Sequence, residues 1–482
     1  MFTPKSRTGM FVFIAKGIYY LKLNWNSPGK QGGLAVKRIL FVFLFAFCVM
    51  GALFADDANP KYVFLFIGDG MSTPQRMMAE EFARKVGHGE LLINHFPSHA
   101  TTRTVSANSL VTDSAAAGTA LACGEKTNNG RIGMSVDGSR RLESVAEVAH
   151  QNGKKVGIVT SVTINHATPA SFYAHRPSRS QYYGIGLDLI DSNFEYFGGG
   201  GFGGYADNTK SSAYRGNLYE LAEKAGYKVV SDPEAFHALK PGDGKVLARG
   251  CEQALPYTID GETDVPTLED FTRKGIELLD NPNGFFMMIE GGSIDWCGHA
   301  NEAATNLMEV LALDKAVRAA LEFAQKHPDE TLIVVTGDHE TGGMTMGFAG
   351  TGYALYVDRL AKQKCSIGRF GELLKKARSA KEDFDFDDAC AMLTKYFGFE
   401  FSGDGPMKIS DSELKTLREA FEQDKLPDAA RRVMNAKAGV GWTSGAHTAL
   451  PVLTTSYGKK ADVFTGFIDN TDIANRLKTL VK

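Results

Sequence analysis

Five segments of the chain are apolar at nearly every position. Strands on the surface of a sheet alternate apolar and polar residues, whereas strands buried on both faces, as in parallel sheets, are apolar throughout. The pattern therefore predicts a core of buried parallel strands. The five predicted strands read YVFLFIGDG from residue 62, KKVGIVTSV from 154, GFFMMIEGG from 284, TLIVVTGDH from 331 and LPVLTTSYG from 450.

Amphipathic helical segments lie between these strands. Residues 141–153 close on a glycine, residues 267–280 open on the capping residue Thr267, and residues 303–327 are apolar on one side. An alternation of buried strands and helices predicts an α/β fold. We expect a doubly wound, mostly parallel central sheet with helices on both faces.

Residues 348–440 differ in character from the rest of the chain. They are rich in charged residues and helix formers and interrupt the series of strands before LPVLTTSYG. We interpret them as a helical insertion on the core. Their acidic string EDFDFDD lacks the glycine and the terminal glutamate of a calcium loop, which favours a solvated helix face over a calcium site.

The composition indicates a globular protein without a strong overall electrostatic field. The 482 residues are 43% hydrophobic and 23% charged, and 53 basic against 56 acidic side chains give a formal net charge of -3. Such a chain buries a large core. It offers no global field that would recruit nucleic acid or an anionic membrane, so a charged ligand must be bound locally.

The N-terminal region carries the pattern of an export signal. Two basic residues precede an apolar run of roughly 16 residues that ends at small residues near Ala55. A membrane anchor is the alternative, but the run is short for a span. We interpret residues 37–55 as a signal peptide, 56–482 as a periplasmic or extracellular domain with no stable membrane anchor, and 1–36 as an extension that fits neither.

Acidic residues and a histidine follow three of the five apolar runs. Asp69, Glu290 and the pair Asp338 and His339 stand at or just beyond the carboxyl ends of their segments. In open parallel sheets the ligand site lies beyond the carboxyl ends of the strands. One such acid would be an ordinary turn residue, but three of them predict polar ligands that converge on one edge.

Two further segments add imidazoles. Asp295 and His299 are four residues apart in GGSIDWCGHAN, which places them on one face of a helix, where they can hold a cation together or form a surface pair. His447 lies in a glycine-flanked loop, GWTSGAHTALP, before the last apolar run. Five cysteines remain after the signal peptide, without close spacing, so the candidate ligands are carboxylates and imidazoles, which suit zinc and magnesium.

Ser114 stands between an aspartate and a run of alanines in SLVTDSAAAGTALACG, with no histidine nearby in the chain. One interpretation is that Asp113 or Ser114 simply caps a helix. The other is that Ser114, at the N-terminus of that helix, loses its proton to a bound metal ion and becomes a nucleophile. The candidate metal ligands favour the second interpretation.

Six ordered motifs resemble those of alkaline phosphatases from about residue 61 to the end, except for the insertion. They are IGDGMS, VTDSAAAGTA, HATPASFYAHRPSR, IEGGSIDWCGHAN, TGDHETGG and SGAHT. The resemblance implies two zinc ions and one magnesium ion. The implied ligands are Asp295, His299 and His447 for the first zinc, Asp69, Asp338, His339 and Ser114 for the second, and Asp69, Thr168 and Glu290, with His166 as a further candidate, for the third ion.

The resemblance also implies the reaction. Ser114 would attack the phosphorus of a phosphate monoester, and water would then hydrolyse the phosphoserine. Arg179 would grip two phosphate oxygens in a fork, oriented by Asp113. The implied partners are small phosphate monoesters and a second copy of the chain in a homodimer, with no dedicated nucleic-acid partner.

Two positions depart from some bacterial members of that family. His166 stands in place of an aspartate and Trp296 in place of a lysine, which puts the identity of the third ion in doubt because an imidazole removes negative charge. The alternatives are a phosphodiesterase or sulfatase of the same superfamily, or a metal- or phosphate-binding protein without catalysis. The glycine run FGGGGFGGYADN lacks the ending of a phosphate-binding loop and is interpreted as a turn.

Overall fold

A computed structural model describes residues 12–14, 17–19, 58–204, 214–261 and 264–482. The chain divides into two units, Met1–Ala58 and Asn59–Lys482. In the first unit, β1 (Val12–Ile14) and β2 (Gly17–Tyr19) form an antiparallel hairpin. The predicted signal peptide and the segment around Ala55 lie outside the described residues. In the described part of the chain, no helix has the length and apolar character needed to cross a membrane.

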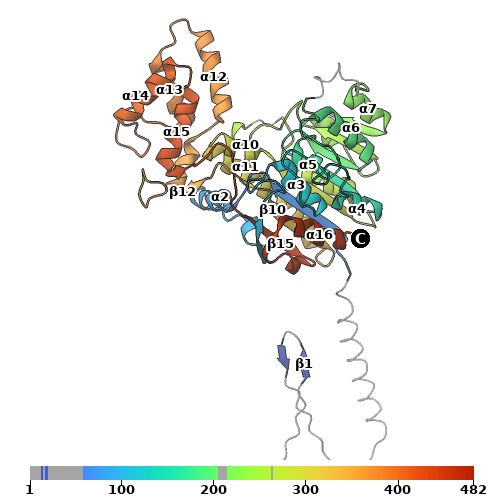
Figure 1. Ribbon diagram of the computed structural model, residues 1–482. Helices are drawn as coiled ribbons and strands as arrows, with labels where there is room; N and C mark the ends of the chain where they lie inside the picture. The colour runs from blue at the N-terminus through green and yellow to red at the C-terminus, as the bar shows by residue number, and fades with distance from the viewer. Residues whose placement is uncertain (1–11, 15–16, 20–57, 205–213, 262–263) are drawn as a thin grey trace, which may run out of the picture. The chain divides into compact units, whose positions relative to one another are not determined.

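The second unit is built on a ten-stranded sheet (Figure 1). Four of the five predicted strands form its centre, where β3 pairs in parallel with β10 on one side and β9 on the other, and β5 follows β9 in parallel. The parallel centre confirms the predicted fold class. The strand order is β16 (Gly466–Asp469), β4 (Ser98–Arg103), β15 (Val452–Gly458), β10 (Thr331–Gly337), β3 (Tyr62–Gly68), β9 (Phe285–Gly291), β5 (Lys155–Thr160), β6 (Tyr196–Gly199), β8 (Lys245–Arg249) and β7 (Tyr227–Val230).

The fifth predicted strand, β15, runs antiparallel to both of its neighbours, β10 and β4. The prediction that it is a parallel strand is therefore wrong. The reason lies in the connection: β10 ends at the edge where β11 (Glu340–Thr341) pairs with β14 (His447–Thr448), so the chain enters β15 from that same edge. A parallel strand would have to start at the opposite edge.

Helices cover both faces of the sheet, because successive residues of a strand point to opposite faces. Phe64 and Phe66 of β3 belong to one buried cluster, and Val63 and Leu65 belong to another. On the Phe64 face lie α2 (Thr73–Val86), α9 (Leu268–Leu279) and α11 (Ala303–Lys326), and on the Val63 face lie α3 (Ser114–Cys123), α4 (Val145–Gln151), α6 (Tyr182–Ser192) and α16 (Asn470–Leu480).

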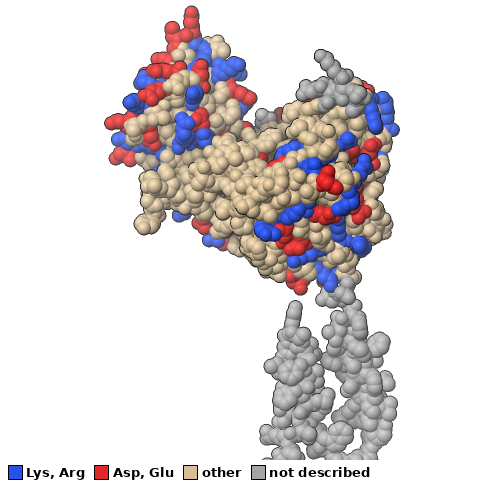
Figure 2. Space-filling model, viewed as in Figure 1, with Lys and Arg blue, Asp and Glu red and all other residues tan. Residues whose placement is uncertain are grey.

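The segment predicted as a helical insertion is helical. It starts and ends beside a short antiparallel pair, β12 (Thr345–Met346) with β13 (Val440–Gly441). Its helices are grouped together in Figure 1 and carry closely mixed acidic and basic side chains in Figure 2. They are η4 (Val357–Lys362), α12 (Ile367–Ala380), α13 (Phe386–Phe397), α14 (Asp411–Glu422) and α15 (Leu426–Ala438).

Within the acidic string, Asp385 caps α13 by accepting a hydrogen bond from the backbone N–H of Asp388 at 3.0 Å. Asp388 in turn pairs with Lys381 at the surface. These contacts agree with a solvated helix terminus rather than a calcium loop.

The aromatic core beneath β3 generates a prediction about stability. Phe64 is fully buried and packs edge-on against Phe285, at 5.1 Å between ring centroids, and against Phe323, at 6.0 Å. We expect Phe64→Ala to lower the free energy of unfolding by about 3–5 kcal/mol, because it removes buried area and leaves a cavity. Urea denaturation measures the change. Phe467→Ala is the matched control, since Phe467 is 72% exposed, and an equal loss in both variants would contradict the assignment.

Candidate metal centre

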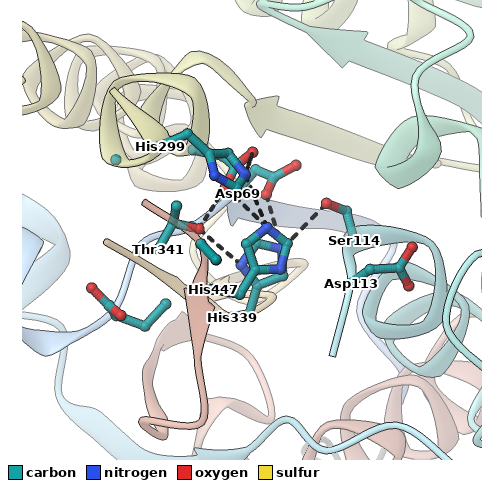
Figure 3. A network of polar contacts seen from close by, with 12 residues as sticks. Asp69, Asp113, Ser114, His299, His339, Thr341 and His447 are labelled. Carbon is teal, nitrogen blue, oxygen red and sulfur yellow. Dashed lines mark hydrogen bonds and ion pairs between the residues drawn. The ribbon is translucent and has the colours of Figure 1, made fainter. Parts of the chain in front are cut away.

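The predicted acids meet at the carboxyl edge of the sheet, as the strand ends predict. Asp69 follows β3, Glu290 is the second-to-last residue of β9 and Asp338 follows β10, and all three are fully buried. The backbone N–H of Asp69 donates to the carbonyl of Gly291 at 3.3 Å. Figure 3 shows the centre of this cluster, in which side chains from distant segments point toward one another.

Ser114 is the first residue of α3, and Asp113 is its N-cap. The Asp113 side chain accepts a hydrogen bond from the N–H of Ala116 at 3.0 Å. The capping interpretation is therefore correct for Asp113. The Ser114 hydroxyl is left to face His339, with 3.2 Å between Oγ and Nε2 (Figure 3). A side chain at this position lies where the free N–H groups of the helix favour an anion.

Three oxygen atoms surround the single nitrogen Nε2 of His339. They are Oγ of Ser114 at 3.2 Å, Oδ2 of Asp338 at 3.2 Å and Oδ1 of Asp69 at 3.3 Å. One imidazole nitrogen carries at most one proton and cannot bond to all three. Neither carboxylate oxygen accepts a hydrogen bond from any residue that the structure describes. The set therefore has unused lone pairs that point at a common centre.

The three distances from Nε2 of His339 fit the edges of a tetrahedral metal site. A tetrahedron with about 2.0 Å between centre and corner, the usual zinc–nitrogen and zinc–oxygen distance, has edges of about 3.3 Å. The distances around His339 match that edge length. The residues implied for the second zinc are thus arranged as its ligands would be.

Asp295, His299 and His447 form a second group with similar spacing. The distances are 3.4 Å from Asp295 to His299, 3.1 Å between the Nε2 atoms of His299 and His447, and 3.5 Å from His447 to Asp295. Asp295 and His299 lie one turn apart on α10 (Ser293–His299), as predicted. Contact with Asp295 raises the pKa of His299 to about 9.

The two imidazoles are oriented through their other nitrogen atoms. Nδ1 of His299 lies 2.8 Å from the carbonyl of Gly445, and Nδ1 of His447 lies 2.8 Å from the carbonyl of Thr112. When Nδ1 donates its proton in this way, Nε2 presents a lone pair, which is the usual arrangement of a metal-binding histidine. The residues implied for the first zinc fit that ion.

The third group contains Asp69, Glu290 and His166, with ligand atoms within 4.8 Å of one another. Thr168 donates to Oδ2 of Asp69 at 3.1 Å, and Oε1 of Glu290 accepts no hydrogen bond from a described residue. His166 is already engaged on one side, because its Nε2 lies 3.2 Å from Nη2 of Arg179. This group fits a cation with oxygen ligands. His166 is the weakest candidate ligand in it, because its Nε2 already contacts Arg179.

Buried charge makes this region unstable without cations. Burial raises the pKa of Asp69 and of Asp338 well above the ordinary value, with a further contribution from neighbouring carboxylates. Burial raises the pKa of Glu290 to about 7. A raised pKa means that the carboxyl group loses its proton less readily. A divalent cation beside it stabilises the ionised form and so lowers that pKa.

Arg179 and Asp113, the residues expected to bind phosphate, contact each other. Nη1 of Arg179 donates to Oδ2 of Asp113 at 3.1 Å, and the same oxygen accepts from the N–H of Gly130 at 2.9 Å. The Arg179 side chain is 27% exposed, so part of it is available to a ligand. Asp113 thus joins the helix cap to the candidate phosphate-binding residue.

The structure adds Thr341 to the site, a residue for which the sequence analysis found no separate signal. Its hydroxyl donates to Asp295 and lies 3.2 Å from Nδ1 of His339 (Figure 3). Thr341 belongs to the motif TGDHETGG, so its position two residues after His339 could have indicated that it lies in the site.

His175, by contrast, is a structural histidine. Its ring contacts the Gly133 carbonyl at 2.9 Å and Glu147 at 3.0 Å.

A glycine is required where β3 meets this cluster. Gly70 has a φ of +71°, and a Cβ atom there would lie 2.8 Å from Cα of Asp295 and from Oγ1 of Thr341. Both the left-handed backbone and the close approach exclude larger residues. Gly70, the second glycine in IGDGMS, therefore allows the loop of Asp69 to pack against α10.

The comparison with known families agrees with this geometry. A family model described as alkaline phosphatase matches residues 60–482. The chain belongs to the alkaline phosphatase family. It is an enzyme, a metal-dependent phosphoric monoester hydrolase.

Relatives and solved structures support the assignment over most of the chain. Alkaline phosphatase 4 of Bacillus subtilis is 32% identical, with 89% of this chain and 90% of the relative covered. The repressible alkaline phosphatase of Saccharomyces cerevisiae is 31% identical, with 91% and 83% covered. The cold-active alkaline phosphatase of a psychrophilic Shewanella species has a TM-score of 0.76 at 30% identity, with 87% of this chain and 100% of that chain covered.

One further solved structure concerns the third metal site of a relative. It is a variant of the alkaline phosphatase from the Antarctic bacterium TAB5, in which a histidine is replaced by glutamate, with magnesium bound in its M3 site. It is 25% identical to this chain, with a TM-score of 0.63 and 88% and 98% of the two chains covered.

The raised carboxyl pKa values predict how metal binding depends on pH. A carboxyl group whose folded-state pKa is raised stabilises the fold below its unfolded pKa, and this contribution is lost as pH rises through the folded pKa. Metal-free protein should therefore lose stability between pH about 4.5 and about 7, where the Glu290 shift alone is worth about 3 kcal/mol.

Added zinc and magnesium should then raise the thermal unfolding midpoint more at pH 8 than at pH 5.5. Differential scanning calorimetry of metal-free and metal-loaded protein measures both shifts, with potassium chloride at equal ionic strength as the control. Equal shifts at the two pH values would contradict the assignment of these carboxylates as ligands.

Proposed function

We propose that this alkaline phosphatase hydrolyses phosphate monoesters through a phosphoserine at Ser114. The observation that carries the proposal is the position of the Ser114 hydroxyl. It lies at a helix N-terminus, 3.2 Å from Nε2 of His339, the nitrogen that also contacts Asp69 and Asp338. A hydroxyl held in this way is suited to become an anion and to attack phosphorus in line.

We propose two zinc ions and one magnesium ion as the cofactors. The cations would lower the pKa of the serine hydroxyl and of water and would neutralise charge on the phosphoryl group. In the TAB5 variant, magnesium in the M3 site accompanies a glutamate in place of a histidine, so magnesium in this enzyme would depend on the oxygen ligands Asp69, Thr168 and Glu290. The proposed ligands are Asp295, His299 and His447 for the first ion, Asp69, Asp338, His339 and Ser114 for the second, and Asp69, Thr168 and Glu290, with His166 beside them, for the third.

The side chains of the enzyme bind and orient the phosphoryl group. Arg179 would donate two parallel hydrogen bonds to non-bridging oxygens, and Asp113 would keep its guanidinium in place through the 3.1 Å contact. The N-terminus of α3 would contribute backbone N–H groups. These contacts engage the phosphoryl group alone, so we expect broad specificity for the alcohol part.

Export belongs to the same proposal. We propose that the mature enzyme starts near residue 56, after removal of the signal peptide at 37–55, and is periplasmic or extracellular. N-terminal sequencing of secreted protein tests this start. We also propose a homodimer, unless the helical insertion at residues 348–440 blocks the subunit contact instead of making it.

Replacing the nucleophile tests the proposed reaction. We expect Ser114→Ala to lower kcat by about 10³-fold or more, because the covalent step is lost, while phosphate still binds. Steady-state hydrolysis of a phosphate monoester measures kcat, and calorimetry measures phosphate binding. The control is Ser139→Ala, which changes an exposed serine. Full activity in Ser114→Ala would rule out the phosphoserine route, and the same assay with a diester and a sulfate ester separates the alternative functions.

The role of Arg179 can be tested by a change that keeps its charge. Lysine cannot make the two parallel hydrogen bonds, so Arg179→Lys should weaken inhibition by inorganic phosphate about 10- to 100-fold. Arg176→Lys is the matched control, since Arg176 binds Asp188 with two nitrogens outside the site. Unchanged phosphate inhibition in Arg179→Lys would show that this residue does not bind the phosphoryl group.

A further inference from the structure

Helix α10 ends immediately after His299 in a defined backbone motif. The N–H of Glu302 donates to the carbonyl of Cys297 at 2.9 Å, and the N–H of Asn301 donates to the carbonyl of Gly298 at 2.9 Å. Asn301 has a left-handed backbone, with a φ of 52°. This is a Schellman motif, in which glycine or asparagine takes the left-handed position.

The side chain of Asn301 connects the end of this helix to the loop that carries His447. Its Nδ2 donates to the carbonyl of Gly298 at 3.0 Å and to the carbonyl of Ser444 at 2.7 Å. The next residue, Gly445, supplies the carbonyl that orients the His299 ring. One amide group therefore fixes both backbone segments from which the two imidazoles extend.

The carbonyl of Asn301 is held in turn by the helical insertion. It accepts hydrogen bonds from Nδ2 of Asn435 at 2.8 Å and from Nη1 of Arg431 at 3.3 Å, and both residues lie on α15. Asn435 is 7% exposed. The insertion thus contacts the backbone two residues after a candidate metal ligand.

These contacts address an electrostatic problem. The Nε2 atoms of His299 and His447 lie 3.1 Å apart, and a cation that binds both must replace any proton held between them. Once that proton is lost the two acceptors repel each other, and backbone contacts that hold both segments preserve their spacing for the cation.

We propose that Asn301 is a positioning residue that presets His299 and His447 for the first cation, and that α15 of the insertion holds Asn301 in place through Asn435. The proposal rests on the metal ligands given under the proposed function. It assigns the insertion a part in metal retention.

The test uses a variant that keeps the backbone and removes the amide. Asn301→Gly preserves the left-handed conformation, because glycine is favoured there, but it cannot bond to Ser444. We expect zinc to leave the intact, metal-loaded enzyme about 10- to 100-fold faster in the presence of a chelator, the usual effect of losing a group that orients metal ligands. The thermal unfolding midpoint of the metal-free protein should change little.

The chain offers a matched control in Asn193. It also has a left-handed backbone, with a φ of 56°, and ends a different helix, α6, where its exposed side chain donates to the Asp191 carbonyl and accepts from Lys245 of β8. Asn193→Gly should release zinc at the wild-type rate. Equal rates for Asn301→Gly and the unmodified enzyme would overturn the proposal.

A second variant tests the part of the insertion. Asn435→Ala removes one hydrogen bond to the Asn301 carbonyl and should speed zinc release about two- to tenfold. Asn435→Asp, which has the same size but no donor at that atom, should do the same. If both retain zinc like the unmodified enzyme while remaining folded, the insertion has no such role.

His447→Ala separates failure of this proposal from failure of the proposed function. It should abolish retention of one zinc ion per chain, measured by atomic absorption after dialysis. Wild-type retention in Asn301→Gly together with loss in His447→Ala would overturn the positioning role alone. Wild-type retention in His447→Ala would instead overturn the metal site.

Discussion

Buried negative charge at the carboxyl edge of the sheet is the constraint on which the rest of the structure depends. Asp69, Glu290, Asp295 and Asp338 are all at most 4% exposed, and an ionised carboxylate loses several kcal/mol of solvation when it is buried without compensation. Their closest partners are threonine hydroxyls and backbone N–H groups, which carry no full charge. Among the neighbouring imidazoles, contact with Asp295 raises the pKa of His299 to about 9, whereas burial lowers the pKa of His339. Divalent cations supply the missing positive charge, so the fold and the chemistry need the same ions.

The direction of β15 follows from the same constraint. A parallel strand after β10 would carry the preceding loop to the opposite edge of the sheet, away from the carboxylates. The antiparallel return brings β14 against β11, with His447 opposite Thr341. An imidazole from the end of the chain thereby joins ligands from β3, β9 and β10. The insertion lies between β10 and β14, which is why its last helix can reach the backbone next to His299.

The sequence predicts the parts of this structure that depend on local pattern. Continuous apolar runs identify the parallel centre of the sheet, and the residues at their ends identify four of the candidate cation ligands, Asp69, Glu290, Asp338 and His339. The strand β4 has the sequence SHATTR, whose buried and exposed positions alternate but whose residues are mostly polar, so hydrophobicity does not reveal it. The direction of β15 and the contact between Asn301 and Ser444 join residues far apart in sequence, and such pairings leave no periodic signal.

The residue at position 166 affects both the third cation site and Arg179. Burial, with the nearby charge of Arg179, lowers the pKa of His166 to about 4, so the ring is neutral near pH 7 and its Nε2 can accept a hydrogen bond from Arg179. A carboxylate in this position would neutralise the guanidinium and would add charge to the third cation site. With imidazole there, Arg179 keeps more of its positive charge for a phosphoryl group, and the third ion depends chiefly on Asp69, Glu290 and Thr168. We therefore expect a carboxylate in place of His166 to raise the affinity for the third ion and to lower the affinity for phosphate.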